Sequence, residues 1–276
     1  MSRILLISDV HLCHANWYGR TSEARLEKML IDINEEHKKQ PIDMILMLGD
    51  YSLDYWECPP YGTYSVNGIS NTQRFIKEFV SRFPCPAYLL PGNHEQYTHE
   101  DWERLTGFKR QFSVVYENNL FLMLDTFGDN LDSKEHNHGT YSFGDVDYIK
   151  AEMAKHPGKR VFLCAHDFFF ATETEEFKKL VRENDSVLAL FGGHTHVSRI
   201  EPMGPELGNK CLFRTGEYSY TSAASVDESV WGFRELILEP DCVSTAYIIP
   251  QNEIKLKDQI INIPYHKQDD AIIKTF

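Results

Sequence analysis

The sequence has no long hydrophobic run, and this absence argues against a membrane-spanning helix. No apolar stretch comes near the roughly 18 residues that a helix needs to cross a bilayer. The apolar run at the N-terminus, Ile4 to Ile7, is followed at once by Ser8 and Asp9. It is too short and too soon charged for a signal peptide, so we interpret it as a buried first strand. We therefore expect a cytoplasmic protein without a membrane segment.

Closely spaced cysteines are also missing. The six cysteines lie far apart, and no two of them form a C-x-x-C pair: Cys13, Cys58, Cys85, Cys164, Cys211 and Cys242. This spacing argues against a zinc site built from thiolates and against a dense disulfide framework. Reduced thiols are the simpler interpretation.

The sequence lacks a cluster of basic residues, and its overall charge is negative. With 28 Lys and Arg against 41 Asp and Glu, the formal net charge is −13. A protein that binds nucleic acid by neutralising phosphates is expected to carry a basic face, so the charge argues against a nucleic-acid partner. The negative charge does not exclude small anionic substrates, because bound metal ions supply positive charge that the residue count omits.

What the sequence does contain is an alternation of apolar strands and amphipathic helices. Apolar runs at 4–7, 44–48 and 87–90 are separated by helical patterns that begin near residues 21–22 and 71–72. This β-α-β-α-β order predicts parallel strands joined by right-handed crossovers. Beyond it we expect a hairpin at 112–125, a helix at 145–155, buried strands at 161–164 and 187–191, and antiparallel strands at 211–213, 232–238 and 243–249.

We divide the chain into a main domain, 1–250, and a C-terminal extension, 251–276, of unknown role. The extension is polar apart from isoleucines at 260, 261 and 263. These isoleucines could add an edge strand or contact a partner.

Five predicted strand ends carry side chains of the types that bind metals in proteins. They are Asp9 with His11, Asp50, Asn93 with His94, His166, and His194 with His196. Two of the pairs are spaced i, i+2, which in extended backbone puts both side chains on one side. A lone histidine at a strand end is usually only a hydrogen-bonding residue. Five such ends that converge on one crevice would instead form a metal site.

The types of these candidate ligands narrow the choice of metal ion. Nitrogen and carboxylate ligands without a thiolate suit Mn, Fe or Zn better than Ca or Mg. The set is large enough for two ions and generous for one.

The order of the motifs, D-x-H, G-D, G-N-H-E, a single H and then G-H-T-H, resembles that of the calcineurin-like metallophosphoesterase superfamily. The resemblance runs from about Arg3 to Ile249. It implies an α/β (mixed α+β) fold, namely a four-layer β-sandwich of two mixed sheets flanked by helices. The active site is then expected at the carboxyl ends of the strands.

The resemblance also implies a role for each motif residue. Asp9, His11, Asp50 and His196 would hold one metal, and Asp50, Asn93, His166 and His194 the second, with Asp50 as the bridge. His94 matches a histidine that binds no metal and lies beside the leaving group, where it acts as general acid. The expected nucleophile is a metal-bridging hydroxide, since two ions roughly 3.5–4 Å apart lower the pKa of the water between them.

We therefore expect a dinuclear metal-dependent phosphoesterase that hydrolyses phosphomonoesters or phosphodiesters of small molecules, with nucleotides among the candidates. A DNA nuclease of the same superfamily is one alternative, against which the acidic balance counts. A non-catalytic scaffold on the same fold is another, against which the complete set of ligands counts. The physiological substrate, the metals and the oligomeric state stay open.

Three local questions also stay open. Glu95 or Asp54 could orient His94, or Glu95 could simply accept hydrogen bonds from backbone amides. The aromatic segments 17–20 and 51–64 could form a substrate rim, with Arg20 on phosphate, or could pack as ordinary loops. The residues after His166, Asp167 to Phe170, depart from the proline-rich sequence that many relatives have there.

Overall fold

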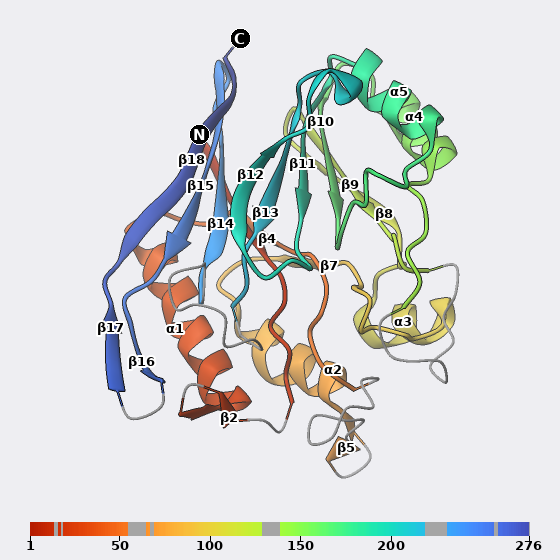
Figure 1. Cartoon of the computed structure of the whole chain (residues 1–276). Coiled ribbons are helices and arrows are strands. Elements are labelled where there is room, and N and C mark those ends of the chain that lie inside the picture. The colour runs from red at the N-terminus through yellow and green to blue at the C-terminus, as the bar shows by residue number, and fades with distance from the viewer. Residues whose placement is uncertain are drawn as a thin grey trace.

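Two six-stranded mixed sheets pack face to face, with helices on both outer sides (Figure 1). The computed structural model describes residues 1–13, 16–17, 19–54, 65–66, 69–128, 139–218, 231–256 and 259–275. Within these residues, no helix is both long and apolar enough to cross a membrane. The predicted four-layer architecture is confirmed.

The first sheet combines the N-terminal parallel strands with three strands from the C-terminal part of the chain. Its order is β18-β15-β14-β1-β4-β7. The strands are β1 (Ser2–Ile7), β4 (Met44–Met47), β7 (Ala87–Leu89), β14 (Phe233–Leu238), β15 (Cys242–Ile249) and β18 (His266–Thr275). β1, β4 and β7 are parallel, as the β-α-β-α-β pattern predicts, whereas β14, β15 and β18 pair antiparallel.

Helices connect the parallel strands of this sheet. α1 (Ser22–Lys39) follows Thr21, whose side chain accepts a hydrogen bond from the Ala24 amide. The second helical segment begins at Asn71, within the predicted range, and Ser70 is the residue that caps it. It consists of α2 (Asn71–Arg74), a π-helical turn (Phe75–Phe79) and a 3₁₀ turn (Val80–Arg82).

The second sheet has the order β12-β13-β11-β10-β9-β8. Its strands are β8 (Phe112–Tyr116), β9 (Asn119–Leu124), β10 (Arg160–Ala165), β11 (Val187–Gly192), β12 (Ser198–Pro202) and β13 (Cys211–Thr215). The helical elements around it are α3 (His99–Thr106), α4 (Val146–Lys155), α5 (Glu175–Glu183) and a 3₁₀ turn (Pro205–Leu207).

One expectation about this sheet is wrong. β13 is antiparallel only to β12 and runs parallel to β11. β12 was not predicted from the sequence, because it is a polar edge strand that ends at Pro202.

Alternating side chains of the strands build the layers. In β1, Leu5 and Ile7 pack toward α1, whereas Ile4 and Leu6 pack against the second sheet. A third apolar cluster lies between the second sheet and the helices α4 and α5. Both faces of each sheet are therefore covered, which explains why the strands are continuous apolar runs in the sequence.

The C-terminal extension is built into this architecture. β16 (Asn252–Leu256) and β17 (Gln259–Ile263) form a hairpin, and β18 adds an edge strand to the first sheet through β15. Ile254 is buried and Ile260 is exposed. Two short hairpins complete the described elements, β2 (Asn16–Trp17) with β3 (Arg20–Thr21) and β5 (Ser65–Val66) with β6 (Ile69–Ser70). The domain boundary at residue 250 stays a prediction.

Candidate metal centre

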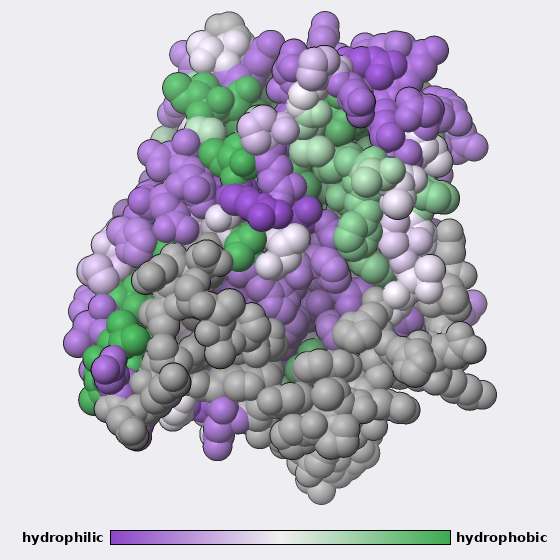
Figure 2. Space-filling view, viewed as in Figure 1, coloured by the Kyte–Doolittle hydropathy of each residue, from purple (hydrophilic) through white to green (hydrophobic). Residues whose placement is uncertain are grey.

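All eight predicted site residues follow the carboxyl ends of parallel strands. In the first sheet, β1 leads to Asp9 and His11, β4 to Asp50, and β7 to Asn93 and His94; in the second, β10 leads to His166 and β11 to His194 and His196. These ends meet where the two sheets face each other. Hydrophilic residues fill the recessed centre of the face shown in Figure 2, and hydrophobic residues lie beside them.

The backbone is strained at this junction. Five site residues have a positive φ angle: Asp9 (54°), His11 (45°), Asp50 (58°), His194 (66°) and His196 (59°). Residues other than glycine rarely adopt positive φ angles, and each one that does costs on the order of 1 kcal/mol. Gly193 permits the close approach of the loops, because a Cβ there would lie 2.4 Å from Ser8 Oγ. The strain is concentrated where the site residues converge.

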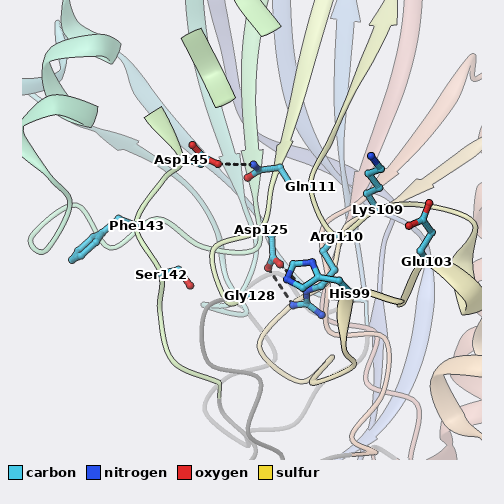
Figure 3. Close-up of a pocket in the computed structure, with 10 residues that line it drawn as sticks. All are labelled: His99, Glu103, Lys109, Arg110, Gln111, Asp125, Gly128, Ser142, Phe143 and Asp145. Carbon is cyan, nitrogen blue, oxygen red and sulfur yellow. Dashed lines mark hydrogen bonds and ion pairs between the residues drawn. The ribbon is translucent and has the colours of Figure 1, made fainter. Parts of the chain in front are cut away.

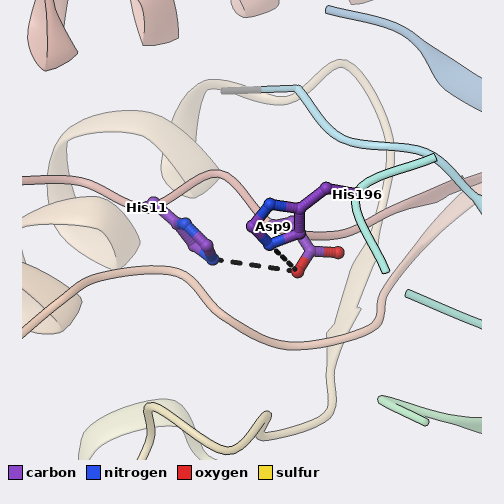
Figure 4. Close-up of side chains that lie close together, drawn as sticks. All are labelled: Asp9, His11 and His196. Atoms are coloured by element: carbon purple, nitrogen blue, oxygen red, sulfur yellow. Dashed lines mark ion pairs between the residues drawn. The ribbon is translucent and has the colours of Figure 1, made fainter. Parts of the chain in front are cut away.

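Asp9, His11 and His196 form the first group of side chains that could hold a cation. Asp9 Oδ1 lies 3.3 Å from Nε2 of His196 and 3.7 Å from Nε2 of His11 (Figure 4). The other oxygen, Oδ2, accepts a hydrogen bond from the His194 amide at 3.0 Å and another from Ser8. These bonds fix the carboxylate so that Oδ1 faces the two histidines.

Asp50, His166 and His194 form a second group on the other side of the crevice. Asn93 Oδ1 lies 2.9 Å from both His166 Nε2 and His194 Nδ1, and these two ring nitrogens are 3.3 Å apart. The opposite nitrogen of His166, Nδ1, lies 2.7 Å from the Leu48 carbonyl oxygen. Because Nδ1 donates to that carbonyl, the neutral His166 ring has its lone pair on Nε2, directed into the group.

Asp50 lies between the two groups. Its Oδ2 is 3.1 Å from His166 Nε2, which belongs to the second group. The same oxygen is 3.4 Å from His11 Nε2, which belongs to the first. One carboxylate oxygen therefore faces ring nitrogens from both groups.

The electrostatics of the site favour a bound cation. Burial opposes ionisation of Asp9, but His196 lowers the pKa of Asp9 to about 2. Burial opposes ionisation of Asp50 as well, yet His166 and His94 hold the pKa of Asp50 well below its usual value. Burial also acts against the charge on His166, whose pKa is nevertheless raised to about 10, chiefly by Asp50. The negative charge of Asp9 and Asp50 that favours a proton on the neighbouring histidine can be neutralised by a metal ion instead.

The remaining donors also fit a metal. Burial lowers the pKa of both His11 and His194, so their rings are neutral at pH 7 and offer lone pairs. Asp9 Oδ1 and His11 Nδ1 are buried with no hydrogen-bond partner in the described part of the chain. Carboxylates, imidazoles and one amide oxygen, with no thiolate, form a donor set suited to Mn, Fe or Zn.

Glu95 binds backbone amides, which is one of the alternatives left open. Its carboxylate accepts hydrogen bonds from the amides of Asp50 (2.8 Å), Tyr51 (2.9 Å) and Gly92 (2.8 Å). Asp54 accepts from the amides of Asn71 and Thr72 at the start of α2. Glu95 thereby ties the loop after β4 to the loop after β7.

His94 lies at the inner edge of the crevice. It is buried, and its amide donates to Asp50 Oδ1 at 3.1 Å. Its Nε2 is 3.8 Å from Asp50 Oδ2, close enough that His11, Asp50 and His94 also form a possible cation group. Its assignment as an acid rather than a ligand stays a prediction.

An aromatic wall stands beside His194 that was not predicted from the sequence. It consists of Phe127, Tyr141, Phe143 and Phe169. The His194 ring lies 5.7 Å from the Phe169 ring and 5.9 Å from the Phe127 ring, centroid to centroid. Tyr141 packs edge-on against Phe169, and the Phe143 side chain is 53% exposed. The departure at Asp167 to Phe170 was the one sequence signal for this wall, because Phe127 and Tyr141 come from distant loops.

The aromatic rim expected from segments 17–20 and 51–64 lies largely outside the described residues, which omit Tyr18, the Trp17 side chain and residues 55–64. Arg20 is described, and it does not face the crevice as a phosphate ligand. It donates to Asn252 Oδ1 (3.1 Å) and to the Glu253 carbonyl (2.7 Å), and its guanidinium lies over the Trp231 ring. Arg20 therefore anchors the C-terminal hairpin.

A cavity of about 540 Å³ shares Phe143 with the aromatic wall (Figure 3). Its lining comes from α3, from the segments that precede β8 and follow β9, and from residues 142–145. On its floor the Arg110 guanidinium donates to both Asp125 oxygens, at 2.6 and 3.2 Å. It also donates to the carbonyls of Glu95 (2.8 Å) and Tyr97 (3.1 Å). Arg110 therefore fastens the turn to the end of β9.

Replacing Arg110 should destabilise the protein strongly. Arg110→Ala would leave the Asp125 carboxylate buried without its partner, and we expect a loss of about 3–5 kcal/mol in the free energy of unfolding. Urea unfolding followed by circular dichroism measures this loss. The control is Arg104→Ala, which removes an exposed ion pair with Asp101 and should cost less than about 1 kcal/mol. Equal effects of the two substitutions would contradict the role of Arg110.

Comparison with known proteins gives a consistent picture. A family model described as calcineurin-like phosphoesterase matches residues 2–198. A probable glycerophosphodiester phosphodiesterase from Arcobacter nitrofigilis is 24% identical over 204 residues, which cover 67% of this chain and 71% of the relative. A probable cyclic nucleotide phosphodiesterase from Coxiella burnetii is 23% identical over 210 residues, which cover 70% and 75%.

A solved structure shares the fold. The purple acid phosphatase PPD1 from yellow lupin superposes with a TM-score of 0.52 at 14% sequence identity. The match covers 97% of this chain and 54% of the plant protein, so the chain spans about half the length of that phosphatase.

Proposed function

Because the chain belongs to the calcineurin-like phosphoesterase family, we propose that it is a dinuclear metal-dependent hydrolase of phosphomonoesters or phosphodiesters of small molecules. The observation that carries this proposal is the position of Asp50, whose Oδ2 lies 3.1 Å from His166 Nε2 and 3.4 Å from His11 Nε2. A carboxylate placed between two groups of donors can serve an ion in each of them.

The proposed ligands follow the two groups of side chains. Asp9, His11, Asp50 and His196 hold one ion, and Asp50, Asn93, His166 and His194 hold the other. When bound, two such ions would lower the pKa of water and neutralise charge on the phosphoryl oxygens. Asn93 contributes an oxygen without adding a further negative charge beside an anionic substrate.

His94 is the proposed general acid. An alkoxide leaving group is strongly basic and needs a proton as its bond to phosphorus breaks. The hydrogen bond from the His94 amide to Asp50 Oδ1 holds this residue next to the ligand that both ions share. A histidine at this place can deliver its proton to the leaving oxygen near neutral pH.

The proposed substrates are small phosphoesters that carry a flat group, nucleotides among them. The two bacterial relatives described above are named as phosphodiesterases. The aromatic wall beside His194 offers ring faces and edges on which a flat group could pack. This supports the proposed substrate class without distinguishing monoesters from diesters.

The charge distribution disfavours the nuclease alternative. Five arginines are buried and contribute little to a basic surface: Arg3, Arg25, Arg110, Arg214 and Arg234. Buried Asp and Glu residues outnumber them. What disfavours binding of a nucleic-acid backbone is the formal net charge of −13 together with the lack of a basic cluster in the sequence. The scaffold alternative is disfavoured because every predicted ligand is present and the ligands converge.

A substrate and metal panel tests the proposed function. Purified protein should contain about two equivalents of metal, and a chelator should abolish hydrolysis. The panel compares an aryl phosphomonoester, an aryl phosphodiester, cyclic nucleotides and single-stranded DNA, each with Mn, Fe and Zn. We expect turnover of small esters and little of DNA. Chelator-insensitive hydrolysis would overturn the mechanism, and no turnover across the panel would favour a scaffold.

A further inference from the structure

Two buried carboxylates stand behind the histidines of the His194–His196 turn and have no role in the proposed function so far. The first is Glu217, which follows β13. Its Oε2 lies 3.3 Å from Nδ1 of His196, and this oxygen has no hydrogen-bond partner among the residues that the structure describes. The other ring nitrogen of His196, Nε2, lies 3.3 Å from Asp9 Oδ1. The His196 ring therefore has a carboxylate on each side.

The second carboxylate is Asp167, which follows β10. Its Oδ2 lies 3.8 Å from Nε2 of His194, an ion-pair rather than a hydrogen-bond distance. In the described ranges this oxygen, too, lacks a hydrogen-bond partner. The other ring nitrogen of His194, Nδ1, faces Asn93 Oδ1 at 2.9 Å.

The two histidines are thus held in opposite orientations. His196 presents Nε2 to the centre and Nδ1 to a buried acid, whereas His194 presents Nδ1 to the centre and Nε2 to a buried acid. A neutral imidazole has one N–H and one lone pair. A carboxylate that faces one ring nitrogen favours the N–H at that nitrogen and so leaves the lone pair on the other one. For His166 the Leu48 carbonyl does this through a direct hydrogen bond.

We propose that Glu217 and Asp167 are positioning residues that fix His196 and His194 in opposite tautomers, and that each strengthens the binding of a different metal ion. Glu217 acts on the ion held with Asp9 and His11. Asp167 acts on the ion held with Asn93 and His166. This inference rests on the proposed function, because it requires that the centre binds metal.

A buried arginine hydrogen-bonds to Asp167, and another acts on Glu217 through its charge. The Arg214 guanidinium donates to Asp167 Oδ1 and, at 3.2 Å, to the Gly193 carbonyl, next to His194. Burial and the charge of Asp9 raise the pKa of Glu217, and the fully buried Arg25 of α1 acts in the opposite direction. A buried charge is costly unless it is compensated. An arginine on one side and a histidine on the other is the arrangement expected for acids that orient metal ligands.

Metal affinity and histidine tautomers test this proposal directly. In the full-length zinc-loaded protein labelled with ¹⁵N-histidine, long-range ¹H–¹⁵N spectra report which ring nitrogen carries the proton. We expect the proton on Nδ1 in His196 and on Nε2 in His194. Chelator competition then measures the affinity of each ion. Glu217→Gln should weaken one ion by about 10–100-fold and Asp167→Asn the other by a similar factor, each with loss of its own tautomer.

Two matched substitutions separate positioning from a structural effect. Glu201→Gln alters another carboxylate that binds Arg214 without contacting His194 or His196 among its described contacts. Asp32→Asn alters a buried carboxylate that binds Tyr218, the neighbour of Glu217. Both should leave zinc affinity and tautomers unchanged, even if thermal stability falls.

The outcomes distinguish this inference from the proposed function. If the wild-type protein binds none of Mn, Fe and Zn, both fail. If it binds two ions but Glu217→Gln and Asp167→Asn leave affinities and tautomers unchanged, only the positioning role fails. If each substitution weakens both ions equally, the assignment of one acid to one ion is overturned.

Discussion

Asp50→Asn is expected to empty both metal positions at once. The substitution removes the one carboxylate that faces ring nitrogens of both groups, so each ion loses a charged ligand. The affinity of each should fall by more than the roughly 100-fold upper range seen when a residue behind a ligand is replaced. Hydrolysis should fall by about 10³-fold or more, which corresponds to about 4 kcal/mol of transition-state stabilisation. Metal analysis and steady-state kinetics measure the two effects.

Asp54→Asn is the matched control for this substitution. Asp54 is a buried carboxylate four residues along the same loop, and it accepts hydrogen bonds from the amides that begin α2. Its replacement should lower thermal stability but leave two equivalents of metal. Loss of only one ion from Asp50→Asn would contradict the bridging position, and retention of both would contradict the whole assignment.

His94→Ala is expected to retain both ions and to lose rate according to the leaving group. An alkyl ester releases a strongly basic alkoxide, so removal of the acid should reduce its hydrolysis by about 10²–10⁴-fold. An aryl ester releases a weakly basic phenolate, and its rate should fall by about tenfold or less. The measurement is kcat for a series of phosphoesters whose leaving groups span a range of pKa values.

The prediction for His94→Ala has a matched control and two outcomes that would contradict it. His99→Ala removes a histidine that lines the cavity of Figure 3 and is not among the predicted site residues, and it should leave the leaving-group dependence unchanged. An equal loss on alkyl and aryl esters would argue against His94 as the acid. Loss of metal would show instead that His94 is a ligand, an arrangement that its proximity to His11 and Asp50 permits.

The site could be anticipated from sequence because its residues follow strand ends. Ile4 to Ile7 and Met44 to Leu48 are continuous apolar runs, and the polar residues directly after them therefore lie at the same edge of a parallel sheet. The chain order of these motifs was sufficient to identify the family. Local periodicity thus predicted both the first sheet's parallel half and the position of its ligand-bearing ends.

Contacts between distant segments could not be anticipated in this way. Glu217 approaches His196 only because β13 pairs beside β11, and no local pattern around Glu217 indicates that pairing. The aromatic wall likewise gathers Phe127, Tyr141 and Phe169 from separate loops. The sequence left open whether Arg20 binds phosphate or packs in a loop, because its partners, Asn252 and Glu253, lie far along the chain.

The strand order of the first sheet has a consequence for biosynthesis. β14 fills the place beside β1, and Ser2 pairs with Leu238. On the ribosome, at about 5–20 residues per second, the apolar edge of β1 must therefore wait on the order of ten seconds or more for its partner. An unpaired apolar edge is where chains mispair and aggregate. Loop closure over this span is also slow. The strand that delivers Asp9 and His11 to the metal centre is thus made long before β14, the strand that covers its second edge.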